Sequence, residues 1–480
     1  TMPNSTLSID STQQEQPRRI EVLAPFDQSL IATLDSADEA SVESALDGAY
    51  SLFRDRTEWL PTEQRIAILE KMVVIMGEQA ESLALEAARE GGKPLIDSRV
   101  EVARAIDSIR ICVDCLRTES GETIPMGINA ASSGKLAFSM REPIGVVVAV
   151  SAFNHPLNLI SHQVGPAIAA GCPVIVKPAE VTPLSCLRFV EIAREAGLPE
   201  AWCQLLLPAS RELSTRLVGD SRVGFLSFIG SARVGWMLRS KLAAGARCAL
   251  EHGGVAPVIV AEDAKLDEVL PKLLKGGFYH AGQVCVSVQR VFIARSLARE
   301  FALQLAAAAK QLVVGDPTSA DTEVGPLIRP SEVERVQQWV NEAIEEGAEL
   351  LSGGKALSVS TFECTVLYAP SVESKVSREE IFGPVVCIYP YDEIDDAIAQ
   401  ANSLPYAFQA ALFSKDIDTA TYAYKKLDAS AVMINDHTAF RVDWMPFAGL
   451  RQSGLGVGGI PYTLRDMQVE KMMVLNSSNI

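Results

Sequence analysis

The feature that most constrains the fold is a series of short apolar runs that starts near residue 143. The runs include "IGVVVAVSAF", "CPVIVKPAE" and "VGFLSFIG", and each is bounded by Gly, Pro or Asn and followed by a helical stretch. A second series starts near residue 250 with "SVQRVFIARS" and "PVVCIYPYD". Fully apolar strands that alternate with helices are typical of parallel sheets covered on both faces. The sequence therefore predicts an α/β protein with two open-sheet units joined near Gly253 and Gly254, and a ligand cleft between them.

The order of these segments gives the expected domains of the 480-residue chain, which is too long for one core. We expect residues 1–18, which are polar and lack an apolar period, to form a flexible tail. Residues 19–120 and 142–252 are assigned to the first α/β unit, and 253–462 to the second. A hairpin pattern at 121–141 and the C-terminal segment 463–480 are expected to form a small β element.

Composition excludes several classes of function. The net charge of −17 argues against nucleic acid or an anionic membrane as a partner, because both require a basic surface. No apolar run approaches the ~18 residues that a membrane-spanning helix needs. The nine cysteines do not have the regular spacing of a disulfide-bonded scaffold, so the sequence favours a reducing compartment such as the cytoplasm. The pair Cys112 and Cys115 has CxxC spacing but no second pair and no nearby His, so no metal site is predicted.

Two groups of polar residues follow apolar runs where a phosphate or a sugar could bind. In "LSFIGSARVG", Gly230 and Ser231 begin a helix and Gly235 lies one turn in, which suits a phosphate at a helix N-terminus. Ser231 could equally be an ordinary N-cap. In "VIVKPAEVTP", Lys177 and Glu180 end a strand, where the carboxylate could accept the hydroxyls of a ribose. A solvent-exposed charge pair is the alternative.

Four further positions carry groups that could act in catalysis. Asn154 in "SAFNHP" could stabilise an oxyanion or form a turn before proline. Glu251 in "LEHGG" could be a general base or a strand end before a hinge. Glu380 in "REEIFGP" could be a site residue or solvated surface. Cys285 in "GQVCVS" could be a nucleophile or a small buried hydrophobe.

Taken in order, "SAFNHP", "VKPAE", "FIGSARVG", "LEHGG", "GQVC", "EEIFGPV" and "MPFAGLRQSGLG" resemble the NAD(P)-dependent aldehyde dehydrogenase superfamily from about residue 20 onward. Glu251 stands 34 positions before Cys285, as the family's base stands before its nucleophile. The resemblance implies that Cys285 attacks the aldehyde carbon and that the Asn154 amide and the Cys285 N–H hold the oxyanion. Hydride transfer then leaves a thioester, which Glu251 helps water to hydrolyse to a carboxylic acid.

The resemblance also implies a Rossmann-like cofactor domain beside a catalytic domain. The cofactor-binding residues that it implies are Lys177 and Glu180 for the adenosine ribose, Gly230, Ser231 and Gly235 for the pyrophosphate, Glu380 for the nicotinamide ribose, and Phe382 beside the nicotinamide. The charge of Glu180 would repel a 2′-phosphate, so NAD is the expected cofactor, with NADP possible.

The chain departs from the family pattern at several positions. Phe153 stands where Trp is usual, His155 replaces an aromatic or aliphatic residue, and His252 replaces Leu beside the base. Gly458 occupies the place of a second glutamate that some members carry, so a proton relay through that acid is not expected.

The expected substrate tunnel is mainly apolar. It is lined by His155, Leu159, His162, Val284, Val286, Phe440, Arg441 and Phe447. Val284 stands where relatives that act on phosphorylated aldehydes tend to carry Arg, so the chain lacks an obvious partner for a dianion. This pattern favours medium- or long-chain aliphatic or aromatic aldehydes. Alternatively, Arg441 could bind the carboxylate of a semialdehyde, or it could pair with an acid such as Asp443.

Three alternative functions each fit part of this sequence. A CoA-acylating dehydrogenase would transfer the acyl group to CoA, but such relatives often lack the base that Glu251 would supply. A cysteine hydrolase would leave the cofactor motifs unexplained. A non-catalytic homologue would be expected to have lost Cys285, Asn154 or Glu251. The β element would expose a sheet edge, so we expect a homodimer or homotetramer.

Overall fold

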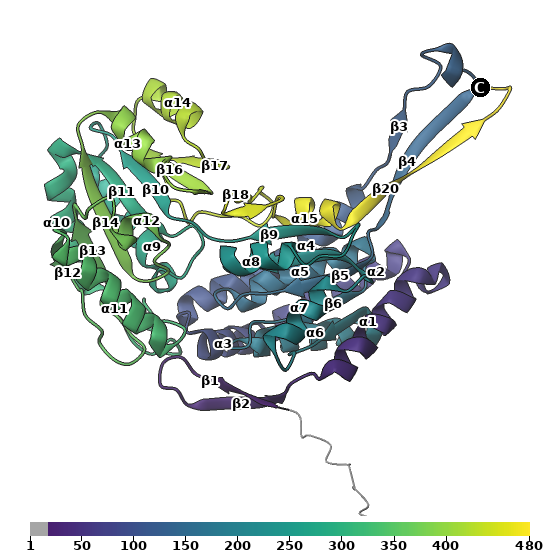
Figure 1. Ribbon diagram of the computed structural model, residues 1–480, viewed down its shortest axis with the longest axis horizontal. Coiled ribbons are helices and arrows are strands. Elements are labelled where there is room, and N and C mark those ends of the chain that lie inside the picture. The colour runs from purple at the N-terminus through teal and green to yellow at the C-terminus, as the bar shows by residue number, and fades with distance from the viewer. Residues whose placement is uncertain (1–17) are drawn as a thin grey trace, which may run out of the picture.

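The computed structural model describes residues 18–480 and has two α/β lobes and a projecting β arm (Figure 1). The expected fold class is confirmed, since each lobe is built on a sheet whose strands are mainly parallel. The sequence predicts a flexible tail at residues 1–18. Residues 1–17 lie outside the described part of the chain, and Arg18 is the first residue that is described. Within residues 18–480, no helix is both long and apolar enough to cross a membrane.

The first lobe contains a six-stranded sheet in the order β19-β9-β8-β5-β6-β7. Its strands are β5 (Val146–Val150), β6 (Val174–Lys177), β7 (Cys203–Leu205), β8 (Val223–Ile229), β9 (Arg247–Glu251) and β19 (Gly454–Leu455). All neighbours pair in parallel except β19, which is antiparallel to β9. Every residue of β5 is buried, as expected for a strand covered on both faces.

Helices surround this sheet. They are α1 (Glu39–Arg54), α2 (Thr62–Glu78), α3 (Ala80–Gly91), α4 (Leu95–Thr118), α5 (Pro156–Ala170), α6 (Pro183–Glu195), α7 (Arg211–Gly219), α8 (Ala232–Arg239) and the late α15 (Ile460–Asp466). The chain enters this lobe through a hairpin of β1 (Arg19–Leu23) and β2 (Leu30–Asp35), which the sequence did not lead us to expect. Because β19 and α15 also pack here, residues 454–466 belong to the first lobe by contact.

The second lobe contains a seven-stranded sheet in the order β12-β13-β14-β11-β10-β16-β17. Its strands are β10 (Ala256–Val260), β11 (Val288–Ala294), β12 (Glu349–Ser352), β13 (Thr365–Tyr368), β14 (Val385–Tyr391), β16 (Gln409–Phe413) and β17 (Ala431–Ile434). Its helices are α9 (Leu266–Phe278), α10 (Arg295–Gln311), α11 (Pro330–Glu345), α12 (Lys375–Arg378), α13 (Ile394–Ala401) and α14 (Ile417–Lys426).

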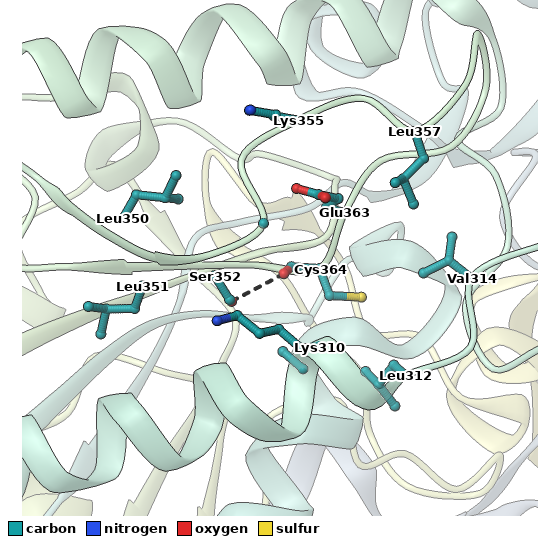
Figure 2. A pocket seen from close by; sticks show the side chains of 12 residues that line it. Lys310, Leu312, Val314, Leu350, Leu351, Ser352, Lys355, Leu357, Glu363 and Cys364 are labelled. Atoms are coloured by element: carbon teal, nitrogen blue, oxygen red, sulfur yellow. Dashed lines mark hydrogen bonds between the residues drawn. The ribbon is translucent and has the colours of Figure 1, made fainter.

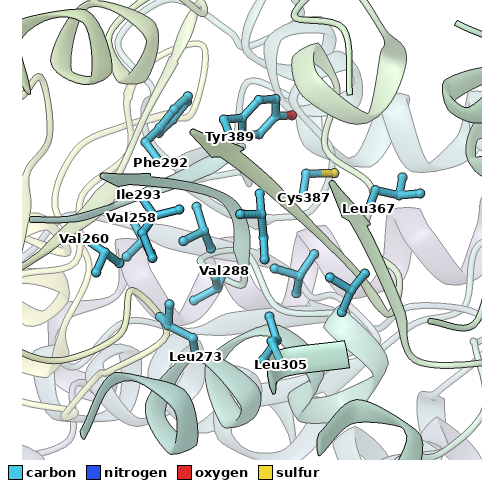
Figure 3. Close-up of a cluster of buried hydrophobic side chains, with 14 of the residues drawn as sticks. Val258, Val260, Leu273, Val288, Phe292, Ile293, Leu305, Leu367, Cys387 and Tyr389 are labelled. Atoms are coloured by element: carbon cyan, nitrogen blue, oxygen red, sulfur yellow. The ribbon is translucent and has the colours of Figure 1, made fainter. Parts of the chain in front are cut away.

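The core of the second lobe lies between this sheet and its helices. Val258 and Val260 of β10 and Val288 and Ile293 of β11 are buried, and Leu305 of α10 belongs to the same cluster (Figure 3). Burying such side chains contributes about 1.5–3 kcal/mol each. The core therefore fixes β10 and β11, and Cys285 lies three residues before the amino end of β11.

The third part is an arm that projects away from both lobes (Figure 1). It consists of β3 (Glu122–Ile124), β4 (Lys135–Pro143) and β20 (Gln468–Asn476), in the order β20-β4-β3. The hairpin and the C-terminal strand thus form one sheet, as expected, with β20 antiparallel to β4 along its whole length. The arm's exposed apolar side chains are Leu136, Met140, Met472, Met473, Val474 and Leu475. A separate two-stranded antiparallel sheet pairs β15 (Tyr406–Ala407) with β18 (Leu450–Arg451).

Candidate active site

Cys285 lies on a turn whose backbone is unusually constrained. The turn follows a short helix, η4 (Tyr279–Gly282), in which His280, Ala281 and Gly282 all have left-handed φ angles of 51°, 54° and 75°. Left-handed backbone at non-glycine residues costs about 1–3 kcal/mol each and persists only where the surroundings impose it. Cys285 itself is half-buried and has no disulfide partner. The chain therefore expends folding free energy to present this one thiol at a fixed position.

Gln283 holds this turn in place. Its side-chain amide donates to the carbonyl oxygens of His280 and Pro326 at 3.1 and 3.2 Å, and its Oε1 accepts from the Ile328 N–H at 3.0 Å. The Asn154 amide, which follows β5, is buried and donates to the Gln283 carbonyl at 3.1 Å. The expected oxyanion donor and the expected nucleophile, 131 positions apart in the sequence, thus meet on one turn.

Glu251 is the last residue of β9, and its carboxylate packs against the backbone of Gly458. A β-carbon at position 458 would lie 2.0 Å from Oε1 of Glu251, so a side chain there would displace the carboxylate. Burial raises the pKa of Glu251, and the guanidinium of Arg441 opposes that shift. A carboxylate with a raised pKa accepts a proton more readily, which is what a general base requires.

The electrostatic surroundings keep the Cys285 thiol protonated in the resting protein. Burial raises its pKa well above the ordinary value, the carboxyl groups of Glu380 and Glu251 act in the same direction, and Arg441 opposes them. Burial also raises the pKa of Glu380 to about 8, although the Gly254 N–H donates to its Oε2 at 2.8 Å. Forming the thiolate therefore requires a further positive charge near Cys285.

Arg441 is half-buried and has no ion-pair partner among residues 18–480. Its guanidinium nitrogens Nε and Nη2 are buried and make no hydrogen bond there, and its guanidinium carbon lies 3.7 Å from the ring centre of Phe447. Asp443, two positions further on, is instead bound by Arg104, which donates to it through two nitrogens at 3.0 and 3.2 Å. Buried nitrogens left unpaired on a cation are costly, so an anionic partner would stabilise this guanidinium.

Three of the apolar side chains that were expected to line the tunnel lie together. Val284, Val286 and Phe447 form one buried cluster with Phe408. Phe440 does not belong to this cluster, and 42% of its surface is exposed. Phe408 was missed because it lies in "YAFQAALF", a segment without a motif, and only the fold brings it to Phe447, where the ring centres are 4.5 Å apart.

The two expected tunnel histidines have other partners. His162 places Nε2 2.8 Å from Oδ1 of Asp443, and burial lowers its pKa to about 4. His155 places Nδ1 2.9 Å from Nζ of Lys93, and burial and that ammonium hold its pKa well below the ordinary value. Both rings are therefore neutral. Leu159, one helical turn from His155, is buried.

Lys93 and Glu101 belong to the support of the site and were not found from the sequence. They form a buried ion pair, and the Glu101 carboxylate also accepts from the N–H groups of Leu157 and Asn158 at 2.8 and 3.0 Å. Glu101 thus satisfies two free donors at the N-terminus of α5. This contact fixes the helix that begins directly after Asn154.

Three of the expected cofactor residues, Lys177, Glu180 and Ser231, border two neighbouring cavities, together called the groove, at the carboxyl ends of β6 and β8. A cavity of about 530 Å³ is bordered by Lys177, Arg211 and Ser231, and a neighbouring one of about 420 Å³ by Lys177, Glu180 and Arg211. Ser231 is the N-cap of α8, where its Oγ accepts from Val234 N–H at 3.4 Å. Basic side chains and a helix N-terminus fit a dinucleotide phosphate.

Two departures from the family pattern pack against this groove. His252 lies under Gly235, where a β-carbon would be 1.9 Å from Nε2, and its Nδ1 is 2.9 Å from the Gln452 carbonyl. Phe153 meets Phe382 edge to face at 5.8 Å. Phe382 has a left-handed φ of 50°, which marks it as a second constrained position at the cleft.

A separate cavity of about 640 Å³ lies in the second lobe, between α10 and β12 (Figure 2). Lys310, Lys355 and Cys364 border it, and none of the expected site residues does. Burial raises the pKa of Cys364 to about 12. Because neither Asn154 nor Glu251 borders this cavity, the reaction site is assigned to the cleft at Cys285.

Comparisons with known proteins agree with this geometry. The family model described as "Aldehyde dehydrogenase family" matches residues 11–473. The chain is 37% identical to the 3-sulfolactaldehyde dehydrogenase of Priestia megaterium over 98% of each chain. It superposes on aldehyde dehydrogenase 21 from Physcomitrella patens in complex with the reaction product succinate, with TM-score 0.92, 35% identity and coverage of 97% and 96%. It also superposes on glyceraldehyde-3-phosphate dehydrogenase GapN from Methanocaldococcus jannaschii complexed with NADP, with TM-score 0.91, 34% identity and coverage of 96% and 100%.

Proposed function

This chain belongs to the aldehyde dehydrogenase family of NAD(P)-dependent oxidoreductases, and we propose that it oxidises a small aldehyde bearing a carboxylate or sulfonate group. Arg441 binds that anion in this proposal. The observation that carries it is the buried guanidinium with two nitrogens that lack a partner among residues 18–480. The expectation of a medium- or long-chain substrate is revised, because an apolar chain would leave this charge uncompensated.

The three relatives named above suit the same substrate class. They are an enzyme for a sulfonated aldehyde, one whose product is the dicarboxylate succinate, and one for a phosphorylated aldehyde. All three substrates or products are small and anionic. A single guanidinium and the neutral Val284 suit a monoanion better than a phosphate dianion. The apolar cluster of Val286, Phe408 and Phe447 adds no further polar group for the substrate.

The proposed chemistry uses the residues around the Cys285 turn. Cys285 attacks the aldehyde carbon, and the oxyanion accepts from the Asn154 amide and from the Cys285 backbone N–H. A bound nicotinamide cofactor supplies the hydride acceptor and a positive charge. Glu251 then takes a proton from the water that cleaves the thioester, and the carboxylic acid leaves. The oxyanion donor contributes about 10²–10³ in rate and the base about 10²–10⁴.

The cofactor is proposed to lie along the groove at β6 and β8. The residues proposed to hold it are Lys177 and Glu180 at the adenosine ribose, Gly230, Ser231 and Gly235 at the pyrophosphate, and Glu380 and Phe382 at the nicotinamide riboside. Ser231, an exposed N-cap that borders the 530 Å³ cavity, supports this placement.

The β arm is proposed to pair with a second copy of the chain, giving a homodimer or a homotetramer. Its apolar side chains are about half exposed, from 40% for Leu136 to 63% for Met140. A projecting strand pair with this many exposed apolar groups is unstable in water unless a partner covers it.

Initial rates of cofactor reduction test the function, with succinic semialdehyde, butanal and decanal as substrates and no CoA present. We expect kcat/KM for the semialdehyde to exceed that for butanal by about tenfold or more, because a charge-assisted contact is worth at least 1.4 kcal/mol. Cys285→Ala is expected to abolish turnover, while Cys248→Ala, at a half-buried thiol on β9, retains it. Faster oxidation of decanal would contradict the substrate class. A strict requirement for CoA would instead indicate the acylating reaction.

A further inference from the structure

The N-terminal end of the described chain reaches into the groove where the adenosine ribose is proposed to bind. Arg18 immediately precedes β1, and its guanidinium forms an ion pair with Glu180. Its Nη1 also donates to the Ala209 carbonyl at 2.9 Å. Glu180, the carboxylate that was expected to repel a 2′-phosphate, therefore has its charge balanced by a residue 162 positions away.

The cavity around this ion pair has a net positive charge. The charged residues that border its 420 Å³ are three cations, Arg18, Lys177 and Arg211, and one carboxylate, Glu180. No ion-pair partner of Lys177 or Arg211 is present in residues 18–480. The N-terminus of α7 adds the hydroxyls of Ser210 and Ser214 to the same wall. Two cations thus remain available for an anion after Glu180 is neutralised.

We infer that Arg18, with Lys177 and Arg211, forms a phosphate subsite that lets the chain bind NADP as well as NAD. The inference rests on the proposed placement of the cofactor along β6 and β8. NADP differs from NAD only by a phosphate on the 2′-hydroxyl of the adenosine ribose, the group that Glu180 would contact. Arg18 is the specificity-determining residue in this assignment, because it both removes the repulsion of Glu180 and offers a guanidinium to the phosphate.

Arg18 can contact Glu180 and a phosphate at the same time. A guanidinium has five N–H donors, and here Nη2 pairs with Oε1 of Glu180 while Nη1 donates to the Ala209 carbonyl. The remaining N–H groups can bind a phosphate while the ion pair keeps the charge of Glu180 balanced. The Arg18 and Glu180 side chains are 54% and 49% exposed, so a cofactor can reach both, and with NAD the other oxygen of Glu180 can accept from a ribose hydroxyl.

Equilibrium binding tests the assignment without any turnover. Isothermal titration of the full chain with 2′,5′-ADP and with 5′-AMP isolates the 2′-phosphate, and NADP and NAD are titrated in parallel. For Arg18→Ala we expect the Kd of 2′,5′-ADP and of NADP to rise about tenfold or more, since one charge-assisted pair is lost. The Kd of 5′-AMP and of NAD is expected to change by less than about twofold, because these nucleotides lack the 2′-phosphate and an exposed ion pair contributes little.

Arg19→Ala is the matched control, because Arg19 is the next residue on β1 and faces Asp35 at 3.4 Å instead of the cavity. This variant is expected to bind all four nucleotides like the unmodified chain. The assignment would be overturned if Arg18→Ala weakened the binding of 2′,5′-ADP and 5′-AMP equally, or if Arg19→Ala caused the same loss of affinity. Neither result would contradict the dehydrogenase function. If the unmodified chain bound neither nucleotide, the cofactor placement itself would be wrong, and the assignment with it.

Discussion

The guanidinium carbon of Arg441 lies 3.7 Å from the ring centre of Phe447, so the cation is stacked on one wall of the cleft that contains Cys285. Its Nε and Nη2 are buried without a protein partner among residues 18–480. An anion on the substrate would satisfy both nitrogens at once.

Arg441→Met keeps the length and apolar stacking of the side chain and removes the charge. We expect kcat/KM for succinic semialdehyde to fall about 100-fold, because losing one partner of a buried charge pair costs 2–5 kcal/mol. Butanal should lose much less, so the ratio of the two substrates is the readout in steady-state kinetics. Since Arg441 also lowers the pKa of Cys285, a loss common to both substrates is expected in addition. An unchanged ratio would show that Arg441 does not bind substrate.

Glu251→Gln separates thioester formation from hydrolysis. The variant should still form the thioester, so stopped-flow absorbance should show one burst of reduced cofactor per site followed by very slow turnover. In the unmodified chain the raised pKa of Glu251 means that its carboxyl group holds a proton to higher pH than usual. Hydrolysis should therefore slow as pH falls through that raised pKa, and Glu251→Gln should lose this dependence. Full turnover without a burst in Glu251→Gln would exclude the base role.

Asn154→Ala removes the side-chain donor proposed for the oxyanion. We expect kcat to fall about 10²–10³-fold with a smaller change in KM, because the donor acts on charge that develops in the transition state. Asn341→Ala, at an exposed position on α11, is the matched control and should behave like the unmodified chain. Circular dichroism of both variants establishes that they are folded. If kcat of Asn154→Ala stayed within a few-fold of the value for the unmodified chain, the amide would only hold the Gln283 turn in place and would not stabilise the oxyanion.

Asp443 is expected to matter for stability. It is buried and accepts from Arg104, from Asn158 at 3.1 Å and from His162 at 2.8 Å. Asp443→Ala leaves these donors unpaired and should cost about 3–5 kcal/mol, visible as a clear drop in Tm by calorimetry. Asp392→Ala breaks an exposed pair with Arg295 and should leave Tm nearly unchanged. Equal Tm values for the two variants would contradict this account.

The arm is expected to control assembly. Replacing Met472 and Val474, which lie two apart on β20, with glutamate places two charges on one face of the arm. Light scattering after size exclusion should show smaller particles than for the unmodified chain. Ile417→Glu, an exposed apolar position on α14, should leave the mass unchanged. An unchanged mass in the double variant would place the interface elsewhere.

Polar residues that end or follow parallel strands can be predicted from the sequence to lie together, because such strands bring their carboxyl ends to one edge. Asn154, Lys177 and Ser231 are examples at β5, β6 and β8, whereas Cys285 lies before β11 and its turn meets the Asn154 amide at Gln283. The sequence did not reveal contacts made by residues without motifs, such as Arg18 with Glu180 or Phe408 with Phe447. These contacts depend on how distant segments pack.

The substrate that we propose differs from the apolar one expected from the sequence for the same physical reason. Asp443 is two positions from Arg441, but Arg104 on α4 binds it, across 339 positions of the chain. Whether Arg441 has an acidic partner thus depended on a helix from the other lobe, which no local pattern around "AFRVDW" could reveal.

The position of Glu251 against Gly458 makes these two positions interdependent. A β-carbon at 458 would lie 2.0 Å from Oε1 of Glu251 and 2.9 Å from the Phe447 carbonyl oxygen, so the carboxylate would have to turn away before a side chain could fit. The effects of substitutions at 251 and 458 should therefore be epistatic, because a second acid at 458 could be added only by moving the base that is already there.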